Sequence, residues 1–286
     1  MPAVYRTFDQ ATLDQQYNAQ ATVGDITPFV EMYAAGSEAA RASLPFEAAL
    51  SFGASPEETL DLFPAGDRAP LLVFIHGGYW RALSKNESSF MAPCLARHGI
   101  ATAAVNYTLR PHATLDQIVA EVRRALAWLY HHSVAFGCDS ERIFVAGSSA
   151  GGHLAGMLVS QGWHATFGVP ETIAKGGVLL SGLYDLEPVQ QCYANDWVGL
   201  DVTSARRNSP LAHLPAAGCP LILTYGGSET DEFKRQSEDY AAVWRSAGFE
   251  ADCFEISQRN HFDIPLELAD PASLLTGKLL ELIATT

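Results

Sequence analysis

The chain has 286 residues, of which 48% are hydrophobic and 17% are charged, so it holds enough apolar material for one large core. Its net charge is −14 and no cluster of Lys and Arg offsets that charge, which argues against nucleic acid as a partner. No apolar run approaches the roughly 20 residues of a membrane-spanning helix, and residues 1–20 are too polar for a signal peptide, so we expect a cytoplasmic protein without a membrane partner.

The sequence contains no internal repeat, low-complexity tract or linker, so we expect a single domain over residues 1–286. Residues 1–45 are interpreted as an N-terminal extension with a helix at 27–42. A short cap-like insertion is expected at about 184–212.

Short apolar segments predict the strands of a central sheet. Two outer strands are expected near 48–52 and 59–63, and the continuous apolar run at 71–75 is typical of a parallel strand covered on both faces. Further strands are predicted at 100–105, 143–146, 177–180, 221–224 and 251–256. Because these strands alternate with helical segments, we predict an α/β fold with a mostly parallel central sheet and helices on both faces.

Capping boxes mark the start of two of the predicted helices. Ser84 with Glu87 opens a helix that ends before Gly99, and Thr114 with Gln117 opens a second one. Later helices are expected at 150–160, 232–246 and 272–284. Since ligands of parallel sheets bind beyond the carboxyl ends of the strands, we expect the functional side chains directly after strands.

Two consecutive glycines, Gly77 and Gly78, follow the strand at 71–75. They either end the strand in a simple turn or curl the backbone so that its N–H groups point into a site. In the second case their amides, together with that of Ala150, would bind the anionic oxygen of a tetrahedral intermediate, each donor contributing about 3–4 kcal/mol in the transition state.

Tyr79 and Trp80 come next, and we predict that both contact the substrate. With residues 184–197 they would form an aromatic pocket, although packing in the ordinary core accounts for them equally well.

The segment Gly147-Ser148-Ser149-Ala150-Gly151 fits the pattern G-x-S-x-G. Its glycines permit a turn tight enough to present the serine hydroxyl at the edge of the sheet. A turn of small residues, where a helix packs close to a strand, is the alternative. The position between a predicted strand and a predicted helix favours a nucleophile elbow, with Ser149 as the nucleophile.

Three acidic residues compete for the next role, because Glu229, Asp231 and Glu232 all follow the strand at 221–224. Asp231 is expected to be the N-cap of the following helix, and Glu232 an ordinary acid of its first turn. Glu229 lies in the loop before both and is our preferred catalytic acid. His261, after the last strand, completes the order serine, acid, histidine and is predicted to be the general base.

Other residues that could carry chemistry are interpreted as structural. No two histidines have the H-E-x-x-H spacing, and the five scattered cysteines form no C-x-x-C pair, so we expect neither a metal nor another cofactor. The histidines assigned to structure are His98, His112, His131, His132, His164 and His213.

Four motifs over about residues 45–285 resemble the kynurenine formamidase (arylformamidase) family, a branch of α/β-hydrolases close to the hormone-sensitive-lipase-like esterases. They are H-G-G-Y-W at 76–80, the elbow continued to Ala155, E-F-x-R-Q-S at 232–237 and N-H-F-D-I at 260–264. The family's catalytic acid stands three residues before the Glu of its E-F-x-R-Q-S segment, which corresponds to Glu229. The family usually has Asp there, has His where Ser148 stands and has Ala where Gly152 stands.

The resemblance implies an α/β-hydrolase fold and a serine hydrolase that needs no cofactor. The expected reaction is the cleavage of small-acyl amides or esters with aromatic leaving groups, foremost N-formylkynurenine in tryptophan catabolism, with a homodimer as a further implication. Two alternatives stay open. One is a short-chain carboxylesterase with the same triad, and the other is an inactive α/β-hydrolase scaffold that binds a ligand as a receptor.

Overall fold

Alternating apolar segments build a central sheet of eight strands in the computed structural model, which describes residues 3–286. The strands lie in the order β1-β2-β4-β3-β5-β6-β7-β8. β2 is antiparallel to both β1 and β4, and the other neighbours are parallel. Their bounds are β1 Glu47–Ser51, β2 Thr59–Phe63, β3 Ala69–Ile75, β4 Ala101–Val105, β5 Cys138–Ser148, β6 Ala174–Leu180, β7 Leu221–Gly226 and β8 Ala251–Ile256.

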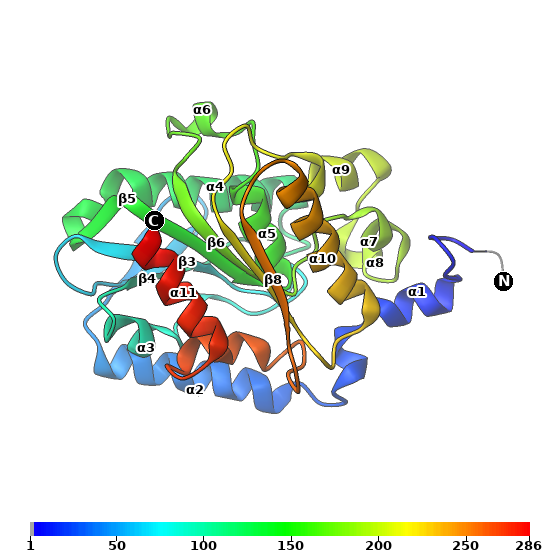
Figure 1. Ribbon diagram of the computed structural model, residues 1–286, viewed down its shortest axis with the longest axis horizontal. Helices are drawn as coiled ribbons and strands as arrows, with labels where there is room; N and C mark the ends of the chain where they lie inside the picture. Colours follow the sequence, from blue (N-terminus) through cyan, green and yellow to red (C-terminus); the bar gives the residue numbers. More distant parts are fainter. Residues whose placement is uncertain (1–2) are drawn as a thin grey trace.

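Helices cover both faces of this sheet (Figure 1). One face carries α4, α5 and α10, and the other carries α2, α3 and α11. The α-helices are α1 Gln10–Gln16, α2 Thr27–Ser43, α3 Ala92–Ala96, α4 Leu115–His132, α5 Ala150–Leu158, α6 His164–Phe167, α7 Glu187–Gln191, α8 Asn195–Val198, α9 Val202–Arg207, α10 Asp231–Ser246 and α11 Leu274–Thr285. The predicted α/β fold is confirmed.

Strand β3 shows why its apolar run must be continuous. Leu71, Val73 and Ile75 point into the core under α4 and α5, whereas Leu72 and Phe74 point into the core under α2 and α11. Side chains alternate along a strand, so a strand with helices on both faces needs apolar residues at every position. All seven residues of β3 are buried.

The helix predicted from Ser84 to a point before Gly99 is wrong. The capping box forms, but it opens only a 3-10 turn, Lys85–Glu87, and a separate short helix follows as α3. The N–H of Ser89 donates to the hydroxyl of Ser37 on α2 at 2.9 Å, so it is not used in a continuing helix. Pro93 has no N–H to donate to an earlier turn and is tolerated only near a helix start.

The two peripheral segments predicted from the sequence are both folded and pack against the rest of the domain. Within the predicted extension, α1 packs against α10, and α2 lies along the opposite face (Figure 1). The predicted insertion consists of α7, α8, α9 and a 3-10 turn, Pro210–Ala212. None of the helices within residues 3–286 combines the length and the apolar character needed to cross a membrane.

Candidate active site

Ser149 lies on a sharp turn between β5 and α5, with φ of 57° and ψ of −118°. This is an unfavourable backbone for a residue with a side chain, and strain of this kind commonly marks functional sites. The neighbouring glycines make the turn possible. A Cβ atom on Gly147 would stand 2.2 Å from the carbonyl oxygen of Gly151, and one on Gly151 would stand 2.0 Å from that of Ile75.

The loop after β3 brings two more glycines next to this turn. A Cβ atom on Gly77 would lie 3.3 Å from the Cβ of Ser149, and Gly78 has φ of 93°, a conformation that favours glycine. Within residues 3–286, the N–H groups of Gly77, Gly78 and Ala150 have no hydrogen-bond acceptor. Three free backbone donors therefore belong to the residues that flank the Ser149 side chain.

Glu229 and His261 meet through a short hydrogen bond. The carboxylate oxygen Oε2 of Glu229 lies 2.7 Å from Nδ1 of His261, and both side chains are buried. The other oxygen, Oε1, accepts hydrogen bonds from the hydroxyl of Ser181 at 2.5 Å and from the N–H of Gly226 at 2.7 Å. Because a carboxylate can only accept a hydrogen bond, Nδ1 of His261 carries the proton. In the neutral ring, Nε2 is then the nitrogen that can accept a proton.

Sequence reasoning missed Ser181, which follows directly after β6. Its position beyond the carboxyl end of a central strand was the available signal. The hydroxyl helps to fix the orientation of the Glu229 carboxylate.

The other two acids of this region do not contact His261. Asp231 is an exposed first residue of α10, and the N-cap is Thr230, so the predicted cap at Asp231 is wrong. The cap position needs no local side chain because Gln16, far away in the sequence, accepts the N–H of Glu232 at 3.1 Å. Glu232 lies in the first turn of α10, as predicted, and is buried in an ion pair with Arg235.

Ser149 and His261 line a common cavity of about 470 Å³, within the size range of small-molecule sites. Gly77, Gly78 and Tyr79 also border it, as do Tyr193 and Trp197 from the predicted insertion. A further wall comes from the N-terminal segment through Asn18, Ala19, Gln20, Ile26, Val30 and Tyr33. The predicted extension is therefore part of the cavity, which its sequence did not indicate.

The chain is similar to known proteins over most of its length. A protein of Danio rerio named kynurenine formamidase is 33% identical over 267 residues, which cover 90% of this chain and 89% of the relative. The chain belongs to the kynurenine formamidase family. The BD-FAE family model also matches residues 61–171.

Solved structures agree with this assignment at the level of the fold. A crystal structure from Silicibacter sp. TM1040, of suggested thioesterase activity, has 28% identity and a TM-score of 0.81, and the match covers 95% of this chain and 98% of that one. Esterase B from Lactobacillus rhamnosis has 19% identity and a TM-score of 0.70, covering 94% and 95%. The protein is a hydrolase with the α/β-hydrolase fold.

Trp80 of the H-G-G-Y-W motif does not have the substrate-contacting role that we predicted for it. Its indole is fully buried, and Nε1 donates to Nδ1 of His153 at 3.3 Å. The ring packs edge-on against that histidine, and Trp80 is not among the described residues that border the cavity. We therefore correct its predicted role from substrate contact to support of α5, while Tyr79 does face the cavity.

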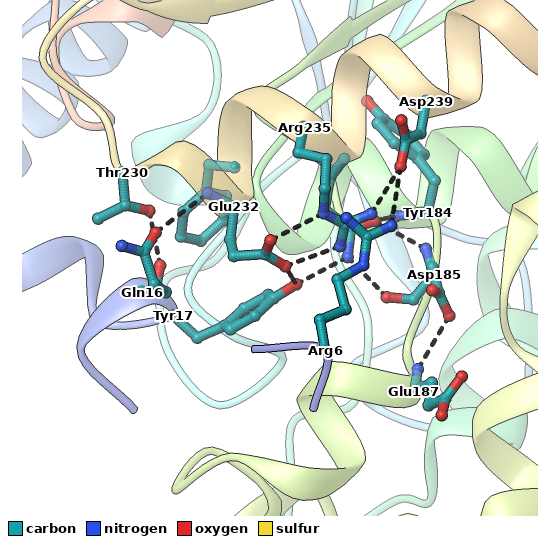
Figure 2. Close-up of polar contacts among 12 residues, drawn as sticks. Arg6, Gln16, Tyr17, Tyr184, Asp185, Glu187, Thr230, Glu232, Arg235 and Asp239 are labelled. Carbon is teal, nitrogen blue, oxygen red and sulfur yellow. Dashed lines mark hydrogen bonds and ion pairs between the residues drawn. The ribbon is translucent and has the colours of Figure 1, made fainter. Parts of the chain in front are cut away.

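In this member of the kynurenine formamidase family, the N-terminal segment is held against α10 by a buried polar network (Figure 2). The hydroxyl of Tyr17 donates to Glu232 at 2.8 Å, and the amide of Gln236 donates to that hydroxyl at 3.0 Å. Arg235 pairs with Glu232 at 2.7 Å. The main-chain oxygen of Tyr17 accepts the hydroxyl of Tyr79 at 2.8 Å, so one residue connects α10 to the H-G-G-Y-W loop.

His76, the first residue of that loop, is also structural. Burial lowers its pKa to about 4, so the ring is neutral near pH 7. It stacks on Tyr107 with ring centroids 4.1 Å apart. In the part of the chain that the structure describes, no group of three or more His, Cys, Asp or Glu side chains is arranged to hold a metal ion.

Proposed function

We propose that this hydrolase cleaves small-acyl amides or esters that have aromatic leaving groups, with N-formylkynurenine as the main substrate and Ser149, His261 and Glu229 as its catalytic triad. The observation that carries the proposal is the 2.7 Å bond between Glu229 and Nδ1 of His261, beside a cavity that Ser149 also lines. The family membership supports the formamide as the substrate class.

The first half of the proposed reaction transfers the acyl group to the enzyme. Nε2 of His261 takes the proton of the Ser149 hydroxyl as its oxygen attacks the carbonyl carbon. The amides of Gly77, Gly78 and Ala150 donate to the oxyanion that forms. When the intermediate collapses, the carbon–nitrogen bond breaks, His261 gives its proton to the leaving aryl amine, and a formyl ester remains on Ser149.

The second half regenerates the enzyme. A water molecule loses a proton to His261 and attacks the formyl ester, again forming an oxyanion at the same amides. The bond to Ser149 then breaks, the serine recovers the proton from His261, and formic acid leaves and loses its proton to water as formate. Throughout, the negative charge of Glu229 stabilises the imidazolium form of His261, and the hydrogen bond fixes the ring orientation.

The test is a comparison of kcat/KM for N-formylkynurenine, phenyl acetate and phenyl octanoate. We expect at least a tenfold preference for N-formylkynurenine over phenyl acetate and a steep fall from acetate to octanoate. The Ser149→Ala variant should lose turnover of all three, whereas Ser148→Ala serves as the matched control and should keep most of it. A preference for phenyl octanoate would indicate a carboxylesterase. Binding of these compounds to the wild type without turnover would indicate a ligand receptor.

A further inference from the structure

Arg81 is an exposed cation that borders the proposed active-site cavity. Its guanidinium lies over the ring of Trp197, with its central carbon 3.6 Å from the ring centroid. Within residues 3–286 no acidic side chain forms an ion pair with it, and its guanidinium has no hydrogen-bond partner. Its charge is therefore available to a ligand.

The other cations nearby are already used by the protein. Lys85 pairs with Asp61 at 2.7 Å. Arg110 donates to the carbonyl oxygens of Trp197 at 2.8 Å and Ala113 at 2.9 Å. Arg81 differs from these two cations because it has no such partner, although the chain has a net charge of −14.

The acidic side chains at the cavity and beside it do not pair with Arg81 either. Glu87 borders the cavity, but one of its oxygens accepts hydrogen bonds from the N–H and the hydroxyl of Ser84, both at 2.9 Å. Glu229 faces His261, Ser181 and the N–H of Gly226. The cavity thus offers an anionic ligand one unpaired permanent cation.

Trp197, whose ring lies under the Arg81 guanidinium, is fixed in place by several contacts. The indole N–H of Trp197 donates to the carbonyl of Tyr79 at 3.3 Å, and its ring packs edge-on against Tyr79 and Tyr193. A guanidinium stacked on a fixed aromatic face keeps its N–H groups free along its edge, where they match the two oxygens of a carboxylate. The arrangement is suited to bidentate recognition of a carboxylate.

We propose that Arg81 binds a carboxylate on the leaving-group side of the substrate, so that the preferred substrates are aryl amides or esters that carry a carboxylate on that side. This inference rests on the proposed function and refines its substrate class. N-formylkynurenine fits the class, because its aryl amine carries an amino-acid side chain that ends in a carboxylate.

The experiment compares each carboxylate substrate with its primary amide, for the wild type and for Arg81→Gln. One pair is N-formylkynurenine and its carboxamide, and the other is the acetate ester of 3-(2-hydroxyphenyl)propionate and its carboxamide. The wild type should prefer the carboxylate over the amide in both pairs. Arg81→Gln should reduce that preference by about 10- to 100-fold, through KM more than kcat, because a hydrogen bond between charged groups is lost.

Two further variants test whether the effect depends on the planar guanidinium and on its position at the cavity. Arg81→Lys keeps the charge but loses the planar fork, so it should retain part of the preference. Arg97→Gln removes the same charge from an exposed site outside the cavity lining and should keep the wild-type preference. Equal losses on the carboxylates and on their amides in Arg81→Gln would overturn the inference, as would a wild type that does not distinguish them.

The ester pair separates this inference from the proposed function. If N-formylkynurenine is not hydrolysed, the proposed function fails, while the ester pair still decides whether Arg81 recognises a carboxylate. If N-formylkynurenine is hydrolysed but its preference is insensitive to Arg81, only the inference fails.

Discussion

The two oxygens of Glu229 have separate tasks. Oε2 accepts from His261, while Oε1 accepts from Ser181 and from the N–H of Gly226. A carboxylate satisfies all three donors, whereas an amide offers only one acceptor oxygen and presents an NH2 group to one of the sides. The carboxylate is therefore required by its surroundings as well as by the imidazolium that His261 forms in the proposed mechanism.

We expect Glu229→Gln to lower kcat by about 10³- to 10⁴-fold, because the amide no longer stabilises the imidazolium and favours the wrong tautomer of His261. Steady-state kinetics on the best substrate measures this loss. Asp231→Asn is the matched control, since Asp231 is exposed at the start of α10 and should tolerate the amide with little change. Wild-type turnover in Glu229→Gln would remove Glu229 from the mechanism.

At the scale of elements, local sequence signals predicted most strands and helices, although the capping box at Ser84 opens only a 3-10 turn, and features that depend on distant residues were not predicted. The strands from β2 to β8 and the box at Thr114 follow from neighbouring residues. The capping of α10 does not, because its partner is Gln16, 216 residues away. Arg81 belongs to no motif, and only its position over Trp197 distinguishes it.

The contact between the N-terminal segment and α10 should depend on the hydroxyl of Tyr17. Tyr17→Phe leaves Glu232 and Gln236 without this shared partner in a buried place, and an unsatisfied buried polar group costs about 1–3 kcal/mol. We expect amide hydrogen exchange to accelerate over residues 10–22 more than in the strands. The main-chain bond to Tyr79 is unaffected by the substitution, so exchange rates that match the wild type would show that this bond alone holds the segment.

Within residues 3–286, burial keeps His76 and His153 neutral near pH 7, and this makes the stability of the whole molecule sensitive to acid. Burial lowers the pKa of both His76 and His153 to about 4. In His153 the proton lies on Nε2, which donates to the carbonyl of Asn208 at 2.7 Å, because Nδ1 accepts from Trp80. A second proton would break the bond to Trp80.

We expect the free energy of unfolding to fall as the pH drops from about 6.5 to about 4. The folded-state pKa lies below the unfolded value, so the unfolded chain binds more protons in this window and gains stability relative to the fold. Each histidine contributes up to about 3 kcal/mol over the full window. Urea unfolding at pH 7 and pH 5 measures the slope.

His153→Gln is the matched variant, since its amide can still donate to Asn208 but does not titrate. Its unfolding free energy should fall less steeply with acid than that of the wild type, with the contribution of His76 remaining. An unchanged slope would mean that His153 does not titrate in this window.

The link between Tyr17 and Glu232 has a consequence for biosynthesis, because 215 residues separate the two partners. At the usual rates of translation, Tyr17 leaves the ribosome on the order of 10 to 40 s before Glu232. During this delay the apolar side of α1, including Leu13, has no helix α10 to cover it. A nascent chain that ends before residue 229 contains Ser149 without the other two members of the proposed triad, so on that mechanism hydrolytic activity begins only when nearly the whole chain has been made.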